Sequence, residues 1–156
     1  MHLNAFTDYC LRTLIYLAVQ PDELATRAQI AAAYEISDNH LMKVVHFLGK
    51  EGLIETLRGR RGGIRLAQAA EEIHIGELVR LCESDVPMVE CFDDAHQQQC
   101  RIDGMCVLKH ALFAAREAMY AELDKYTLSS LVSNRQDLAK RLAVIHFLPA
   151  PVGPAK

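Results

Sequence analysis

The spacing of hydrophobic residues predicts three helices in the first third of the chain. Over residues 3–18 the apolar positions recur every three or four residues, which is typical of a helix with one buried face. Thr26-Arg27-Ala28-Gln29 has the pattern of a capping box and opens a shorter helix. A third amphipathic helix is predicted to begin after Ser37 and to end at Gly52.

The second and third of these helices, with the segment after them, predict a winged helix-turn-helix. The two helices are separated by a short turn, as in DNA-binding helix-turn-helix motifs. Leu53–Leu57 and Ile64–Ala67 then have strand character and flank a turn of glycine and arginine residues. A β-hairpin directly after a helix-turn-helix is a wing.

Further helices with a polar loop between them are predicted in the second half. Ile75–Glu83 is amphipathic, and from about Met105 to Tyr126 apolar residues are spaced by three or four. A continuous apolar seam on so long a helix requires a partner, and in a chain of 156 residues we expect a second copy. Thr127 caps a last short helix, and the proline-rich end is expected to be disordered.

The predicted fold class is mostly α, a winged helix-turn-helix domain with a two-stranded β wing plus a long C-terminal dimerisation helix. The expected segments are a DNA-binding domain (1–83), a cluster-binding loop (84–104), a dimerisation helix with a short capping helix (105–135) and a C-terminal segment with a disordered tail (136–156).

Composition and charge refine this prediction. A hydrophobic content of 51% with 24% charged residues is typical of a folded globular domain. No apolar run is long enough to span a membrane, and the first twenty residues lack a secretory signal, so a cytoplasmic protein without a membrane partner is expected. The net charge of −3 conceals a basic segment, because residues 43–65 hold six Lys and Arg against two Glu.

This basic segment indicates binding to duplex DNA. Arginine side chains in the wing suit the negative potential of a minor groove, and its glycines allow close approach to phosphates. The first turns of the third helix are where such domains contact base edges. The candidate DNA contacts are Ser37, Asn39, His40, Lys43, Arg58, Arg60, Arg61, Gly62 and Gly63. A winged domain used for protein contacts is the alternative.

Three of the five cysteines, Cys91, Cys100 and Cys106, lie in one polar segment. An odd number without a secretory signal argues against a disulfide framework. Their gaps of eight and five residues are wider than the close pairs of structural zinc sites, whereas thiolates on a flexible loop can ligate different irons of an iron–sulfur cluster. Zinc and a metal-free thiol switch are the alternatives. Cys10 and Cys82 fall on apolar helix faces and are expected to be buried.

Several segments resemble the winged-helix iron–sulfur transcriptional regulators. They are FTDYCLRTLIYLA, SDNHLMKVVHFLGKEGLIETLRGRRGGIRLA and the three-cysteine loop before a long helix, and the resemblance runs from Leu3 to about Val132. GRRGGIRLA, IGELVR and LDKYTLSSLV are most similar to the nitric-oxide-sensing repressors of this family. The resemblance implies a homodimer in which the loop cysteines bind a cluster, and nitric oxide destroys the cluster and releases DNA.

The resemblance also implies a fourth cluster ligand. Asp8 matches the acidic residue that nitric-oxide-sensing members supply from the partner subunit. An ordinary ion pair with Arg12, one turn along the helix, is the alternative, and His96 and His110 are the other candidate ligands. The gap of eight residues between the first two cysteines departs from the five that are usual in the family. Lys109 stands where members that regulate cluster assembly place a ligand histidine.

The sequence therefore predicts a transcriptional repressor and not an enzyme. Its affinity for a palindromic operator would be controlled by a nitric-oxide-sensitive cluster, 4Fe–4S or alternatively 2Fe–2S. Another interpretation is a regulator of the same family that senses iron–sulfur supply or redox state. An electron-transfer iron–sulfur protein is disfavoured, because an arginine-rich wing serves no such role and no acid–base constellation accompanies the cysteines.

Overall fold

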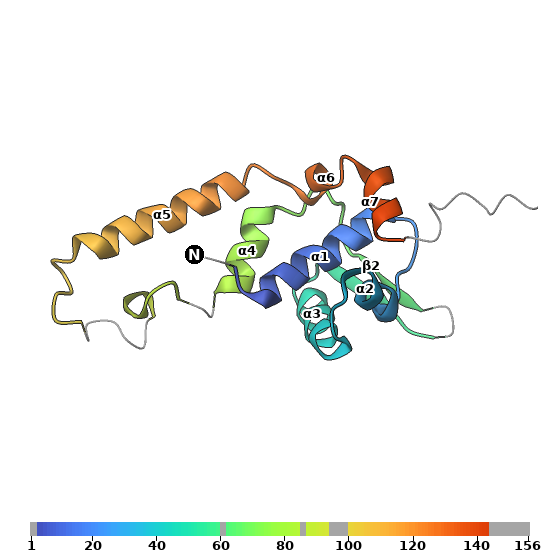
Figure 1. Ribbon diagram of the computed structural model, residues 1–156, viewed down its shortest axis with the longest axis horizontal. Coiled ribbons are helices and arrows are strands. Elements are labelled where there is room, and N and C mark those ends of the chain that lie inside the picture. The colour runs from blue at the N-terminus through green and yellow to red at the C-terminus, as the bar shows by residue number, and fades with distance from the viewer. Residues whose placement is uncertain (1–2, 60–61, 85–86, 94–99, 144–156) are drawn as a thin grey trace, which may run out of the picture.

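The computed structural model describes residues 3–59, 62–84, 87–93 and 100–143. Its elements are α1 (Ala5–Val19), α2 (Arg27–Tyr34), α3 (Asp38–Lys50), β1 (Ile54–Leu57), β2 (Gly63–Leu66), α4 (Ile75–Glu83), the 3-10 helix η1 (Glu90–Phe92), α5 (Val107–Leu123), α6 (Leu128–Leu131) and α7 (Arg135–Arg141). The mostly helical winged helix-turn-helix is confirmed, and Figure 1 shows α1 crossing the middle of its body.

Side chains at the helix starts explain why the first three helices begin where they do. Asn4 and Ser37 each accept a hydrogen bond from the backbone N–H three residues further on. Thr26 and Gln29 form the reciprocal capping box that the sequence predicts. Glu35, with a left-handed φ of 54°, ends α2 and turns the chain into α3. The helix-turn-helix geometry is therefore encoded locally.

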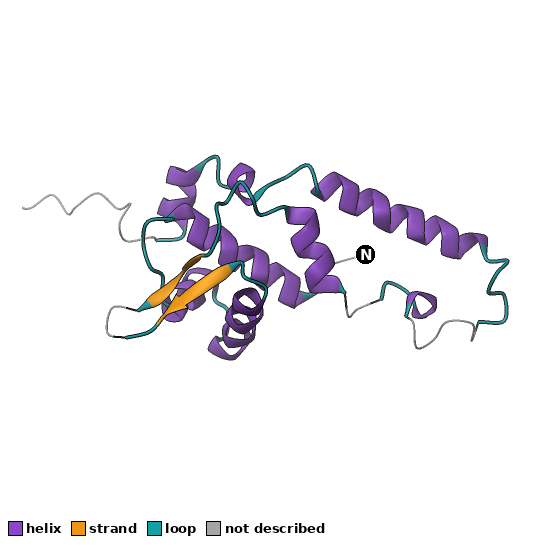
Figure 2. Cartoon of the chain, turned by 180° about the vertical axis from the view of Figure 1, so that it is seen from behind, coloured by secondary structure: helices purple, strands orange, loops and turns teal. Residues whose placement is uncertain are grey.

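The wing is a two-stranded antiparallel hairpin that is tied to the segment before α2. Ile54 pairs with Leu66, and Leu57 pairs with Gly63. Each end of the two strands lies within one residue of its predicted position. Ile64 exchanges two backbone hydrogen bonds with Ala25, of 2.8 and 3.0 Å. Figure 2 shows the hairpin beside α3, so the wing and the third helix share one side of the molecule.

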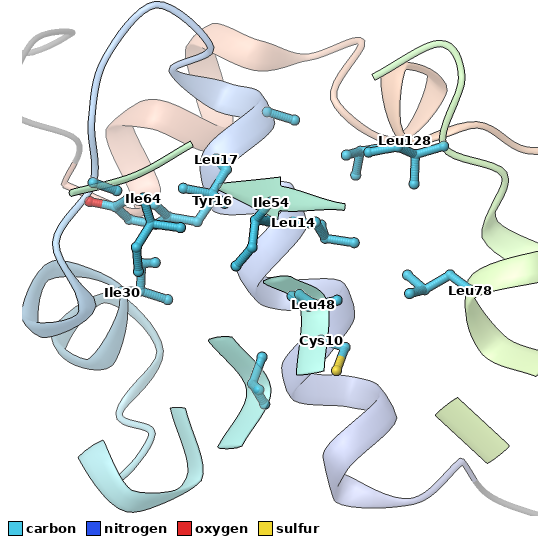
Figure 3. Packing of buried hydrophobic residues seen from close by; sticks show 14 of the residues in the cluster. Cys10, Leu14, Tyr16, Leu17, Ile30, Leu48, Ile54, Ile64, Leu78 and Leu128 are labelled. Atoms are coloured by element: carbon cyan, nitrogen blue, oxygen red, sulfur yellow. The ribbon is translucent and has the colours of Figure 1, made fainter. Parts of the chain in front are cut away.

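The core is arranged around α1. Cys10, Leu14 and Leu17 on this helix are at most 1% exposed. Figure 3 shows them among buried side chains from the other elements: Ile30, Leu48, Ile54, Ile64, Leu78 and Leu128. α1 contacts α3, α4, α6, α7 and β2, so it connects nearly every part of the winged domain.

The helix α5 extends away from this body (Figures 1 and 2). It begins two residues later and ends three residues earlier than predicted, because Cys106 caps its start and the chain leaves the helix at Asp124. All residues of α5 are described, and no side chain among them is buried. Leu108, at the start of the predicted seam, is 64% exposed, whereas Leu123 near its end packs against the core. The role of this helix in dimerisation stays a prediction.

The C-terminal segment contains a helix that the sequence pattern did not predict. α7 buries Ala139 and packs on α1, and the Arg135 Nε donates to the Val19 carbonyl at 2.6 Å. Seven residues are too few to establish a hydrophobic period. The tail predicted to be disordered, residues 147–156, lies outside the described residues. Within the described part of the chain, no helix is both long and apolar enough to cross a membrane.

The junction between α4 and the end of α5 is closely packed. Arg80 binds Asp124 through two hydrogen bonds of 2.7 and 2.5 Å, and its guanidinium lies 4.8 Å from the centre of the Tyr120 ring. A Cβ atom at Gly76 would lie 1.9 Å from Asp124 Oδ1 and 2.8 Å from its backbone nitrogen. The absence of a side chain at Gly76 therefore allows this contact.

We expect Gly76→Ala to lower the free energy of unfolding by about 1–3 kcal/mol, because the added methyl group must displace backbone at Asp124. Gly49→Ala is the matched control. A Cβ at this position in α3 would meet nothing within 4 Å, so the change should be neutral or stabilising by roughly 0.5–1 kcal/mol. Urea unfolding followed by circular dichroism measures both. Equal stabilities for the two variants would show that the junction is looser than described.

Candidate functional site

The exposed face of α3 carries the helical candidates for DNA contact. Asn39 and Lys43 are exposed and point away from the core. Ser37 and His40 are held in place, since the Ser37 hydroxyl lies 2.9 Å from His40 Nδ1 and the His40 ring packs 5.6 Å from the Tyr9 ring. A surface with two fixed and two free polar side chains is suited to reading base edges.

The wing adds basic side chains to the same face of the molecule. Arg58 is exposed at the end of β1, whereas Arg65 is paired with Glu55 across the hairpin. Gly63 has a structural reason to be glycine, because a Cβ there would lie 2.7 Å from the Leu24 Cβ. Gly62, another candidate contact in the wing, is partly buried. The other candidate wing contacts, Arg60 and Arg61, lie outside the described residues.

The three clustered cysteines lie on segments around the first turn of α5. Cys106 caps the helix, and its sulfur accepts the Lys109 backbone N–H at 3.3 Å. Cys91 is in η1, and Cys100 opens a turn that leads to Cys106. Cys91 and Cys106 are half-buried and Cys100 is exposed, and none of the three is in a disulfide. Among the described residues, however, no three His, Cys, Asp or Glu side chains are close enough to hold one metal ion.

Aromatic packing fixes the Cys91 segment against α5. The Phe92 ring lies 6.3 Å from the Phe113 ring in an edge-on arrangement. The Arg116 guanidinium is 5.0 Å from the centre of each ring. This contact places Cys91 beside α5, near the end that Cys106 caps.

A lysine and an aspartate complete this end of α5. Lys109 Nζ binds the Asp103 carboxylate at 2.8 Å. Asp103 raises the pKa of Lys109, and negative charge on Cys91 and Cys106 acts in the same direction. The same ion pair lowers the pKa of Asp103. A positively charged residue whose backbone contacts the Cys106 sulfur therefore lies at this end of α5.

The donor set fits an iron–sulfur cluster better than a single metal ion. Thiolates are the ligands of such clusters, and backbone N–H groups commonly donate to their sulfurs. Here the three free thiols lie in η1, at a bend and at the N-cap of α5, and the thiol at the N-cap already receives an N–H bond. A bound cluster would require these segments to close around it, because the thiols are not preassembled.

Of the three other candidate ligands, Asp8 and His110 lie among the described residues. Asp8 pairs with Arg12 at 2.9 Å, the alternative that the sequence left open, and both side chains are more than 40% exposed. His110 Nδ1 lies 3.1 Å from the Cys106 carbonyl oxygen. His96 lies outside the described residues. A role for Asp8 as a ligand from a second chain therefore stays a prediction.

Cys10 and Cys82 belong to the core, as predicted. They are 0% and 8% exposed. Contact with Cys82, together with burial, raises the pKa of the Cys10 thiol. Next to this pair Glu83, which sequence reasoning missed, accepts the Asn4 backbone N–H at 2.9 Å and the Thr7 hydroxyl. These contacts join the end of α4 to the beginning of α1.

Sequence comparisons identify relatives over almost the entire chain. The profile of the Rrf2 family, described as an iron-dependent transcriptional regulator, matches residues 3–134. The HTH-type transcriptional regulator NsrR of Bacillus subtilis is 53% identical over 143 residues, 91% of this chain and 97% of the relative. NsrR of Halalkalibacterium halodurans is 48% identical over 139 residues, 88% of this chain and 94% of the relative.

Solved structures agree with the fold. The oxidized form of Staphylococcus aureus CymR has a TM-score of 0.67 at 29% identity and covers 85% of this chain and 97% of its own. T. potens IscR has a TM-score of 0.69 at 20% identity, over 86% of this chain and 88% of its own, which is a likeness of fold alone.

The exposures predict two classes of thiol. In the metal-free, reduced protein we expect iodoacetamide to label Cys91, Cys100 and Cys106 readily. Cys10 and Cys82 should react at least about 10³-fold more slowly, because a domain stable by about 5 kcal/mol exposes its core only on unfolding. Peptide mass spectrometry over time gives the five rates, and labelling in urea is the control. Early labelling of Cys10 would contradict its placement in the core.

Proposed function

The chain belongs to the Rrf2 family of iron-dependent transcriptional regulators, and we propose that it represses transcription through an iron–sulfur cluster that nitric oxide disrupts. That it is a transcriptional regulator and not an enzyme was predicted from the sequence and is confirmed. The likeness to the nitric-oxide-sensing repressors is also confirmed, since curated relatives 44–53% identical to it are named NsrR. The observation that carries the proposal is the presence of three free, at least partly exposed thiols on the segments that lead into α5.

In the proposed complex, α3 and the wing bind duplex DNA together. Asn39 and Lys43 would approach base edges and phosphates from the exposed face of α3, while Ser37 and His40 keep the first turn of the helix rigid. Arg58, Arg60 and Arg61 would enter the adjacent groove from the wing. The operator would be palindromic, because two copies of the chain related by a two-fold axis present two such surfaces.

Cys91, Cys100 and Cys106 would hold the cluster, which we propose to be 4Fe–4S. A carboxylate is a hard oxygen donor beside three soft sulfurs, so Asp8 of a second chain would be the ligand most easily displaced. When bound, the cluster would supply an iron site at which nitric oxide can react. Members of the family that regulate cluster assembly place a ligand histidine at the position of Lys109. Here the Lys109 ammonium binds Asp103, which further disfavours a ligand at this position.

The proposed signal reaches the DNA surface through α1. The cysteine segment follows α4, whose last residue Glu83 is bonded to the start of α1. On the other side of α1, Phe6 packs edge-on against Phe47 at 5.1 Å and Tyr9 contacts His40. Movement of the cysteine segment would therefore displace α3. A coupling of only 1–3 kcal/mol, or about 5–150-fold in affinity, suffices for regulation.

We expect Cys91→Ala, Cys100→Ala and Cys106→Ala each to abolish the cluster, because only these thiols are accessible to it. Cys10→Ala and Cys82→Ala are the matched controls and should retain iron and sulfide, since both residues lie in the core. Iron and sulfide analysis of protein purified without oxygen measures all five variants. A full cluster in any of the first three would refute the ligand assignment.

Nitric oxide should lower operator affinity in step with loss of the cluster absorbance, by about 5–150-fold. The measurement is a fluorescence anisotropy titration of holoprotein on operator DNA after graded additions of nitric oxide. If nitrosylated protein binds as tightly as holoprotein, the sensing proposal fails.

Lys43→Ala provides the control for DNA contact in the same titration. It should keep the cluster and the relative response to nitric oxide, because Lys43 is exposed on α3, whereas the three cysteines lie on other elements. Its affinity should be weaker at every stage, and the slope of log affinity against log salt should fall by about one. An unchanged affinity would remove Lys43 from the DNA surface.

A further inference from the structure

We propose that Lys109 sets the reduction potential and lability of the cluster, by holding a positive charge beside Cys106, one of the proposed ligands. Lys109 would be a positioning residue and not a ligand. The inference rests on the proposed function, since it requires a cluster on the three thiolates.

The first support is that the Lys109 side chain is held in one place. A solvated lysine normally samples many rotamers, and its charge is then averaged over a wide volume. Lys109 is instead 31% exposed and bound at 2.8 Å to Asp103, which is itself only 23% exposed. By comparison, Lys125 and Lys140 are 67% and 64% exposed. Lys109 is therefore the more confined charge.

The second support is the direction in which this charge acts. Lys109 is in direct contact with a proposed ligand, since its backbone N–H donates to Cys106 Sγ, and its ammonium is held by Asp103 in the turn that precedes Cys106. Asp103 is also the main cause of the raised pKa of Lys109, so the side chain carries its positive charge. A cation beside an anionic cluster favours added negative charge on it.

The third support is that the backbone and side chain of Lys109 act on the same site. Its backbone N–H donates to Cys106 Sγ at 3.3 Å, at the first turn of a helix of 17 residues. Hydrogen bonds to sulfur, net charge and solvent exposure are the properties by which proteins set cluster potentials. Substitution of the side chain leaves the N–H in place, so the contribution of the charge can be measured separately.

Electrostatics gives opposite signs for the two members of the ion pair. Reduction adds an electron to an already anionic cluster, so a nearby cation favours the reduced form and a nearby anion opposes it. Removing the charge of Lys109 should therefore lower the potential. Removing the charge of Asp103 should raise it, because an opposing carboxylate is lost and the ammonium is free to approach the sulfurs.

A merely structural ion pair predicts a different pattern. If Lys109 and Asp103 only fasten the turn before α5, then breaking the pair from either side loosens the same turn. Both variants would then shift the potential in the same direction and speed the loss of iron equally. The sign of the Asp103 variant therefore separates a structural role from an electrostatic one.

The experiment compares holoprotein with Lys109→Met, Lys109→Arg and Asp103→Asn by spectroelectrochemistry without oxygen. Lys125→Met is the matched control, since Lys125 also forms an ion pair, with Glu122, beyond the far end of α5. A helix of 17 residues spans about 25 Å, well beyond the screening length of about 8 Å at physiological salt. The second measurement is the rate of cluster loss to an iron chelator.

Lys109→Met should shift the ratio of reduced to oxidised cluster about tenfold toward the oxidised form, or about 59 mV for a one-electron couple. It should also lose its cluster to the chelator severalfold faster. Lys109→Arg and Lys125→Met should remain near the wild-type potential, and Asp103→Asn should lie above it.

Two outcomes would overturn the inference while leaving the proposed function intact. One is a Lys109→Met potential equal to that of Lys125→Met, and the other is a shift of Lys109→Met and Asp103→Asn in the same direction. Wild-type protein that binds no cluster would instead refute the proposed function itself.

Discussion

The burial of one whole face of α1 is the constraint on which the other features of this molecule depend. Its inner face contacts α3, α4, α6, α7 and β2, and Cys10 and Leu14 are inaccessible to solvent. Protein interiors are packed as densely as organic crystals, so a displaced helix moves its neighbours. The segment that leads to the cysteines and the helix that would bind DNA are attached to opposite sides of α1. They therefore cannot shift independently of one another.

The two sides of α1 are attached by different kinds of contact. Toward α4 the attachment is polar, because the Glu83 carboxylate binds the start of the helix, where backbone N–H groups favour an anion. Toward α3 it is aromatic, through Phe6 with Phe47 and Tyr9 with His40. The strength of a hydrogen bond depends on its angle, whereas aromatic rings can shift slightly against each other and stay in contact. A movement of the cysteine segment would thus alter the Glu83 hydrogen bonds to the start of α1. The aromatic contacts would then transmit the shift of α1 to α3.

The helix caps and the buried helix faces could be predicted from the sequence because they depend on neighbouring residues. The surroundings of the cysteines could not, because they depend on contacts between distant segments. The capping box at Thr26 and the buried face that contains Cys10 follow from residue type and helical period alone. The Lys109 pair with Asp103 and the stacking of Arg116 on Phe92 depend on how an irregular segment folds back onto α5. No periodicity describes such a path. The candidate ligands were therefore predictable as residues, but their surroundings were not.

The exposed side chains of α5 connect dimer formation to the cysteine site. Leu108 is 64% exposed, and apolar surface in water costs about 25 cal/mol per Å². A second α5 packed along the seam that contains Leu108 would cover this side chain and exclude water. On another face of the same helix, Phe113 contacts Phe92, the neighbour of Cys91. One helix thus carries both the proposed dimer seam and a contact with the segment of a proposed ligand, so a dimer that fixes α5 would also steady the cysteine segment.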